Sequence, residues 1–143
     1  MALSINAAKG DFLPGIVPVL YLKVRINMRQ NTDWGYIDWE YLPDPGNPKR
    51  WFSVGKTTVL PGRRQPPHVH YGYEQFLYVL SGEADAVFNG VSSHIRQGDY
   101  FILDADTTHE AFNSGSAPYV EIVVTNPSSL SLTPQPKPQT AQY

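Results

Sequence analysis

The chain has 143 residues, of which 41% are hydrophobic and 17% are charged. This balance is ordinary for a globular protein, and the length fits one domain with a sizeable core. The formal net charge of -2 provides no basic surface, so we expect no nucleic-acid partner. The absence of cysteine excludes a thiol nucleophile, disulfides and thiolate metal ligands.

The N-terminal region lacks the pattern of a targeting signal or a membrane span. Its first residues do not combine a basic region with the apolar core of a signal peptide. The apolar run at residues 12–22 is too short to cross a bilayer, and it contains Pro14 and Pro18. We therefore expect a cytoplasmic protein with no membrane partner.

Short strands separated by turns are predicted along the chain, because prolines and glycines interrupt it and no long stretch has helical periodicity. In the first fifty residues, strands are predicted at 19–28 and 34–41, separated by a polar turn at 29–33. The later predicted strands are 51–60, 67–70, 75–80, 84–88, 91–95, 100–103 and 119–125. Regularly spaced short strands predict an all-β sandwich or barrel.

Within this series, Asn89-Gly90 predicts a tight hairpin, because both residues tolerate a positive φ. The chain divides into three regions. Residues 1–50 form an N-terminal extension whose strands are expected to pack on the barrel or at a dimer interface. Residues 51–126 form the barrel, and residues 127–143 form a proline-rich tail that is expected to be extended.

Two of the four histidines, His68 and His70, are separated by one residue in a segment predicted to be extended. Alternate residues of a strand share a face, so both imidazoles are expected to point the same way. Imidazole is a good ligand for Zn, Fe, Ni and Cu. The pair therefore predicts part of a metal site.

The segments around these histidines and around residue 109 resemble the two sequence motifs of the cupin superfamily. The first motif runs Gly, five residues, His-x-His, three or four residues, Glu, six residues, Gly. The second runs Gly, five residues, Pro-x-Gly, two residues, His, three residues, Asn. The residues at matching spacings are Gly62, His68, His70, Gly82, Gly98, His109 and Asn113.

This resemblance covers roughly residues 51–125 and implies a single-domain jelly-roll barrel of the cupin type. It also implies that His109 is the third metal ligand. Asp104 and Asp106 stand where the second motif has proline and glycine. The fourth histidine, His94, lies outside both motifs and is predicted to be a surface residue.

The acidic ligand of the first motif is replaced. Counting back six residues from Gly82 reaches Gln75, whereas Glu74 satisfies the shorter spacing from His70. We favour Gln75 as the fourth ligand, with Glu74 as the alternative, because Gln75 keeps the following strand in the family register. Three imidazoles and an amide would leave the full charge on a divalent ion and favour an anionic group of the substrate.

If Gln75 points inward, Leu77 and Val79 share its face and are expected to line a largely apolar substrate pocket. Tryptophans 34, 39 and 51 are predicted to belong to the core or to an interface. Glu110 is not expected in the site, because it is adjacent to His109 and neighbouring strand residues face opposite ways.

These features predict a small metal-dependent cupin enzyme that acts on an apolar or aromatic organic substrate. Family members with three-histidine sites include oxygenases, isomerases, lyases and cyclases, and no acid–base residue can be named from the sequence. The expected cofactor is one divalent transition metal ion, Fe, Zn, Mn, Ni or Cu. The alternative is a non-catalytic metal- or ligand-binding or sensing protein. The resemblance also implies a homodimer.

Overall fold

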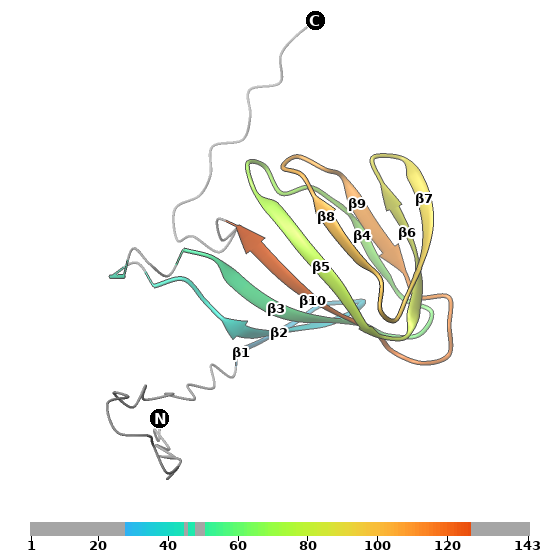
Figure 1. Cartoon of the computed structure of the whole chain (residues 1–143). Helices are drawn as coiled ribbons and strands as arrows, with labels where there is room; N and C mark the ends of the chain where they lie inside the picture. The colour runs from blue at the N-terminus through green and yellow to red at the C-terminus, as the bar shows by residue number, and fades with distance from the viewer. Residues whose placement is uncertain (1–27, 45, 48–50, 127–143) are drawn as a thin grey trace, which may run out of the picture.

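Alternating short strands and turns build two antiparallel β-sheets in the computed structural model, which describes residues 28–44, 46–47 and 51–126 (Figure 1). No helix occurs in these ranges. The strands are, in chain order, β1 (Met28–Asn31), β2 (Gly35–Tyr41), β3 (Ser53–Val59), β4 (Arg64–His68), β5 (Glu74–Ser81), β6 (Glu83–Phe88), β7 (Val91–Arg96), β8 (Tyr100–Leu103), β9 (His109–Phe112) and β10 (Tyr119–Asn126). The predicted all-β jelly-roll sandwich is confirmed.

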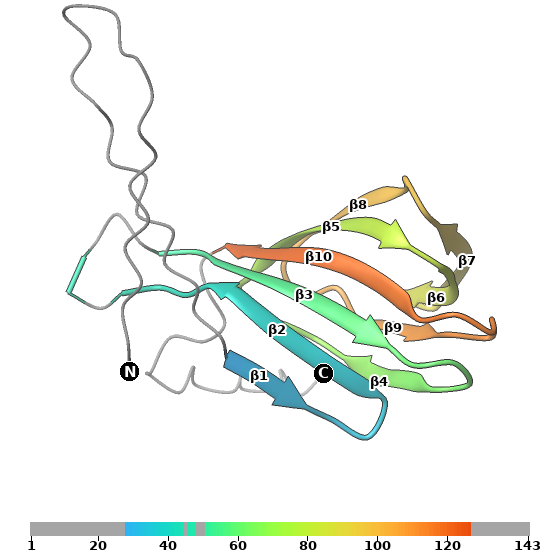
Figure 2. The same ribbon diagram turned by 90° about the horizontal axis from the view of Figure 1, so that it is seen from below.

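The larger sheet has the strand order β1-β2-β3-β10-β5-β8, and the smaller sheet has the order β4-β9-β6-β7. From β3 to β10 the chain changes sheet at almost every connection, which is the crossing pattern of a jelly roll. Figure 2 shows β1 and β2 continuing the larger sheet outward from β3. The arrangement brings the inner faces of β4 and β9 opposite those of β5 and β10.

The predicted hairpin is present between β6 and β7. Phe88 pairs with Val91, and the two residues between them have positive φ values, 47° for Asn89 and 82° for Gly90. Two successive positive values are those of a type I′ turn, whose twist matches that of the flanking strands.

The prediction of a polar turn at residues 29–33 was wrong for its first part. Met28–Asn31 forms β1 and pairs with β2, and the turn lies after it. The polar side chains of β1 find partners across the strand pair, since the Arg29 guanidinium bonds the Asp38 carboxylate at 2.7 Å and Gln30 accepts from the Trp39 indole at 3.2 Å. Strand predictions at 19–27 and the C-terminal tail lie outside the described residues.

The main core cluster fills the space between the sheets with the buried side chains of Val59, Val79, Ala84, Ala86, Ile95, Ala111 and Tyr119. Small residues on the smaller sheet make room for the fully buried Tyr119 ring from the larger one. A second cluster contains Leu77, Leu103 and Val123. Phe88 and Phe101 pack against both clusters, which join into one interior.

The outer face of β5 and β8 exposes four large side chains, those of Phe76, Tyr78, Tyr100 and Ile102. Exposed apolar groups gathered on one face are typical of an interaction surface. The homodimer implied by the sequence resemblance stays a prediction, and this face is one surface that could serve it. Among the described residues, no helix is long and apolar enough to cross a membrane.

Candidate metal centre and cavity

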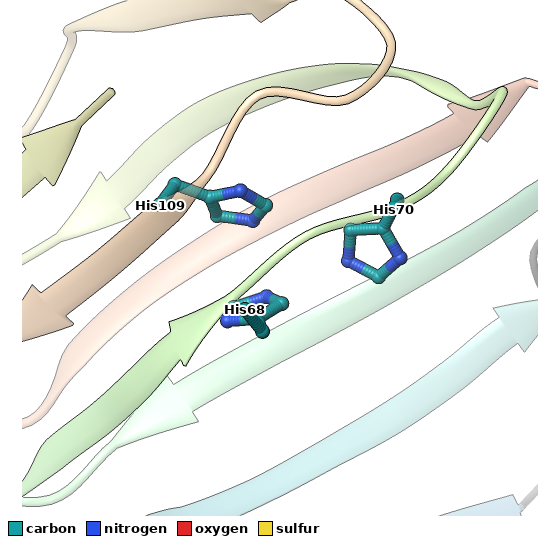
Figure 3. A group of neighbouring side chains, drawn as sticks. All are labelled: His68, His70 and His109. Carbon is teal, nitrogen blue, oxygen red and sulfur yellow. The ribbon is translucent and has the colours of Figure 1, made fainter. Parts of the chain in front are cut away.

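The three predicted histidine ligands come together at one place between the sheets (Figure 3). His68 ends β4, His109 begins β9, and these two residues pair directly across the smaller sheet. His70 lies in the loop after β4, and its ring turns back toward the other two. The ring nitrogens available for a metal all lie within 4.8 Å of one another.

Backbone carbonyl groups orient two of the three rings. Nδ1 of His68 lies 2.9 Å from the Pro66 oxygen, and Nδ1 of His109 lies 3.0 Å from the Thr107 oxygen. A carbonyl can only accept, so Nδ1 carries the hydrogen in each ring and Nε2 keeps a free lone pair. Metal-ligating histidines are commonly oriented by such a bond from the other ring nitrogen.

Two of the imidazoles are neutral at physiological pH. Burial lowers the pKa of His70 to about 4, helped by its two histidine neighbours. Burial also lowers the pKa of His109 to about 4, against the opposing effect of the Thr107 carbonyl. Neutral imidazole is the form that binds metal, so these rings need lose no proton to do so at pH 7.

The structure points Gln75 inward and Glu74 outward, because the two residues alternate at the start of β5. Gln75 is 5% exposed, and its Nε2 donates to the Thr125 hydroxyl at 3.1 Å. Its Oε1 is buried and has no hydrogen-bond partner among the described residues. An unpaired buried oxygen is costly, so this atom is suited to a ligand that the cavity receives.

A cavity of about 270 Å³ opens beside the histidines and Gln75. Its other lining residues are Gln30, Trp34, Ile37, Trp39, Thr57, Gln65, Pro66, Leu77, Glu121, Val123 and Thr125. The wall is mainly apolar and includes the indoles of Trp34 and Trp39. The sequence predicted these tryptophans in the core or at an interface and did not predict them in a pocket. This volume lies just below the usual range for small-molecule pockets, about 300–1,000 Å³.

The remaining predicted residues divide between the cavity and its surroundings. Leu77 lines the cavity, whereas Val79 is fully buried in the main core and does not line it. Glu110 faces away and pairs with Arg64 at 3.0 Å. His94 is exposed and lies 2.8 Å from Asp85, whose hydrogen bond raises the pKa of that histidine.

Asp106, one of the two departures from the second motif, holds the loop that carries His70. Its φ of 68° lies in the left-handed region, where the motif has glycine. Its carboxylate accepts from the Gly72 amide at 2.9 Å, and its own amide donates to the His70 carbonyl at 3.2 Å. The aspartate therefore stands where the motif has a conformationally free glycine, and its hydrogen bonds connect the β8–β9 loop to the β4–β5 loop.

Glu121 is the acidic residue among the described residues that line the cavity, and the sequence did not nominate it. The inward positions of β10 are Tyr119, Glu121, Val123 and Thr125, while the alternate positions carry three aliphatic residues. Amphipathic patterning would place the aliphatic face in the core and Glu121 in solvent. The observed orientation is the reverse, because both faces of this central strand are at least half-buried.

These residues fit a metal ion. Two Nε2 lone pairs, a third neutral imidazole and a free amide oxygen face one cavity, and imidazole with oxygen donors suits first-row transition metals. Metal–nitrogen bonds of about 2.0–2.1 Å require the nitrogens to draw closer than the 4.8 Å limit.

The sequence matches the family model described as "Cupin domain" over residues 55–125. A solved structure of an uncharacterized protein with a double-stranded β-helix domain, from Klebsiella pneumoniae, is 30% identical, with a TM-score of 0.54. The match covers 64% of this chain and 88% of that one. The chain therefore belongs to the cupin family.

Two further structures share the fold. A predicted oxalate decarboxylase from Thermotoga maritima is 23% identical with a TM-score of 0.55, over 64% of this chain and 80% of that one. An RmlC-like cupin from Shewanella frigidimarina is 17% identical with a TM-score of 0.59, over 73% and 87% of the two chains. No curated protein matches the chain.

Proposed function

We propose that this cupin is a metal-dependent enzyme that acts on a small apolar or aromatic organic substrate. The observation that carries the proposal is the set of three histidines whose ring nitrogens converge within 4.8 Å beside a mainly apolar cavity. His68, His70 and His109 would hold the ion, with Gln75 as a fourth ligand through Oε1. When bound, a divalent ion would supply Lewis-acid polarisation of a substrate oxygen.

The residues of the chain have separate parts in this proposal. The Pro66 and Thr107 carbonyls keep two imidazoles in the tautomer that binds metal. Thr125 holds the Gln75 amide so that its oxygen faces the cavity. Leu77 and Val123 contribute apolar wall that excludes water, and Trp34 and Trp39 provide flat surfaces for a ring.

The metal content of purified protein tests the site. We expect one divalent transition metal ion per chain by elemental analysis, and its loss in His109→Ala, because two imidazoles and an amide bind such an ion much more weakly. His94→Ala is the matched control, since this histidine is exposed and remote from the cavity. Metal-free protein that cannot be reconstituted, or equal metal content in both variants, would contradict the proposal.

A non-catalytic ligand-binding or sensing protein is the second candidate, and the amide at Gln75 favours it. Replacement of the carboxylate usual at this position is one way for such a site to lose turnover. Gln75→Glu separates the two candidates, with the exposed Glu74→Gln as control. Loss of an existing turnover in Gln75→Glu supports the enzyme, whereas gain of a redox activity absent from the parent supports the binding protein.

A further inference from the structure

Among the described residues, Glu121 is a buried carboxyl without a basic partner. It is 5% exposed and lies on β10 between Thr57 of β3 and Val79 of β5, neither of which carries a charge. No salt bridge to it occurs in the described part of the chain. Its hydrogen-bond donor is the hydroxyl of Tyr119, at 2.5 Å.

A purely structural role for this side chain does not require a carboxyl. Glutamine at the same position would accept the Tyr119 bond without placing an ionisable group in the interior. Burial raises the pKa of Glu121 to about 7. In the described part of the chain, the other titratable groups that face its surroundings are Tyr119, which donates to it, and the three histidines of the cavity lining.

Glu121 lines the same cavity as the histidines but at a different level of the sheet. Gln75 pairs with Thr125, and Glu121 lies four residues before Thr125 on the same strand. At about 3.3 Å per residue the two levels are about 13 Å apart along β10. Val123 and Leu77, which pair with each other, form an apolar level between them.

The cavity therefore has two polar ends and an apolar middle. The histidine end, when loaded with a divalent ion, attracts an anionic oxygen. The Glu121 end accepts a hydrogen bond. The indoles of Trp34 and Trp39 and the side chain of Ile37 border the space on the β2 side. A flat ring with polar groups on opposite sides matches this distribution.

We infer that the cavity binds a small aromatic acid whose carboxylate or other anionic oxygen meets the histidine end and whose ring hydroxyl or amine donates a hydrogen bond to Glu121. This inference rests on the proposed metal site and names the ligand class for it. Glu121 is then a specificity residue that contacts the ligand directly. Tyr119 positions the Glu121 carboxyl through its hydrogen bond.

The test uses two acids that differ only in the group directed at Glu121, benzoate and 4-hydroxybenzoate. Their affinities for the zinc-loaded protein are measured by calorimetry at pH 6 and pH 8. The wild type should bind the hydroxy acid at least about tenfold more tightly at pH 8, as expected for a hydrogen bond to a charged acceptor. The preference should be smaller at pH 6, where Glu121 is largely protonated.

Glu121→Leu should reduce the preference to below about threefold and leave zinc content unchanged. Glu121→Gln keeps an acceptor for Tyr119, so it tests the role of the carboxyl even if the leucine variant does not fold. It should show a smaller preference that no longer changes with pH. Glu110→Gln is the control, because this carboxylate faces away from the cavity and should leave the preference intact.

Three outcomes would overturn the inference: equal affinities of the wild type for the two acids, no binding of either acid by zinc-loaded protein, or a full preference in Glu121→Leu. None of them would contradict the metal site as long as the wild type binds zinc. A wild type that binds no zinc contradicts the proposed function instead. The same two acids are then compared on metal-free protein through tryptophan fluorescence, where equal affinities or absence of binding would also overturn the role of Glu121.

Discussion

Gln75 shows how one amide can serve two purposes at the edge of the candidate metal site. Its nitrogen is occupied by Thr125, which fixes the orientation of the group and leaves the oxygen without a partner. Ser53, on the other side of Thr125, also has an unpartnered buried oxygen. Unpaired acceptors in a buried row are expected where a ligand or water completes the bonding.

At the same scale, Glu121 makes stability depend on pH. Its pKa is raised to about 7 in the folded protein from an ordinary value of 4.5, so the folded state binds its proton more tightly. The resulting stabilisation is complete below about pH 4.5 and is lost as the pH rises through 7. Relative to Glu121→Gln, the unfolding free energy of metal-free wild type should fall by on the order of 3 kcal/mol across this range.

Urea denaturation at a series of pH values measures this difference. Comparison with the glutamine variant cancels the histidines, whose lowered pKa values act in the opposite direction between about pH 4 and 6.5. Parallel stability curves for the two proteins would show that Glu121 does not retain its proton in the fold.

At the scale of elements, two loops rather than two strands determine where His70, the third candidate ligand, lies. The β4–β5 loop carries His70, and the β8–β9 loop holds it through the backbone amide of Asp106, which donates to the His70 carbonyl, and through the Asp106 carboxylate, which accepts from the Gly72 amide. The β8–β9 loop is in turn held by Asn89, whose side chain accepts from the Thr108 amide at 2.9 Å. The hairpin between β6 and β7 thus supports the candidate metal site.

Asp106→Gly should separate stability from metal binding. Glycine relieves the left-handed backbone, a gain of about 1 kcal/mol, but removes the acceptor for Gly72. We expect about tenfold weaker zinc binding by competition with a chromophoric chelator, with little change in thermal stability of the metal-free protein. Asp106→Asn keeps an acceptor and tolerates the conformation, so it should bind zinc like the wild type. Unchanged zinc affinity in Asp106→Gly would show that the tether does not position His70.

At the scale of the whole molecule, the proposed ion would connect parts of the chain that are distant in sequence. Two ligands come from paired strands of the smaller sheet, one from a loop, and Gln75 from the larger sheet. Binding to the folded state alone stabilises it by about 2.7 kcal/mol at a hundredfold excess over Kd.

Removal of metal should therefore lower the melting temperature by on the order of 10 °C for a chain of this size. Calorimetry with and without a chelator measures the shift, and zinc should restore it. His109→Ala should melt at the same temperature under both conditions. A chelator-induced shift of equal size in that variant would place the stabilising metal elsewhere.

Much of this architecture could be predicted because it depends on local chemistry. The hairpin at Asn89-Gly90 follows from the positive φ that both residues accept, and the short strands follow from the turn residues between them. β1 was misplaced because its polar residues resemble a turn until their partners on β2 are known. Such cross-strand pairs join residues that are distant in sequence, so the residues of β1 alone do not reveal them.

The residues of the chain predicted an all-β sandwich or barrel and the pair His68 and His70, because turn residues and ligand spacing are local properties. The resemblance to the cupin motifs added the jelly-roll class and His109. Tertiary structure alone decided that Gln75 faces the cavity, that Val79 belongs to the core, and that Glu121 points inward. In β5 and β10 both faces are apolar enough to be covered, so alternation cannot tell inside from outside. Only the packing of one sheet on the other makes that choice.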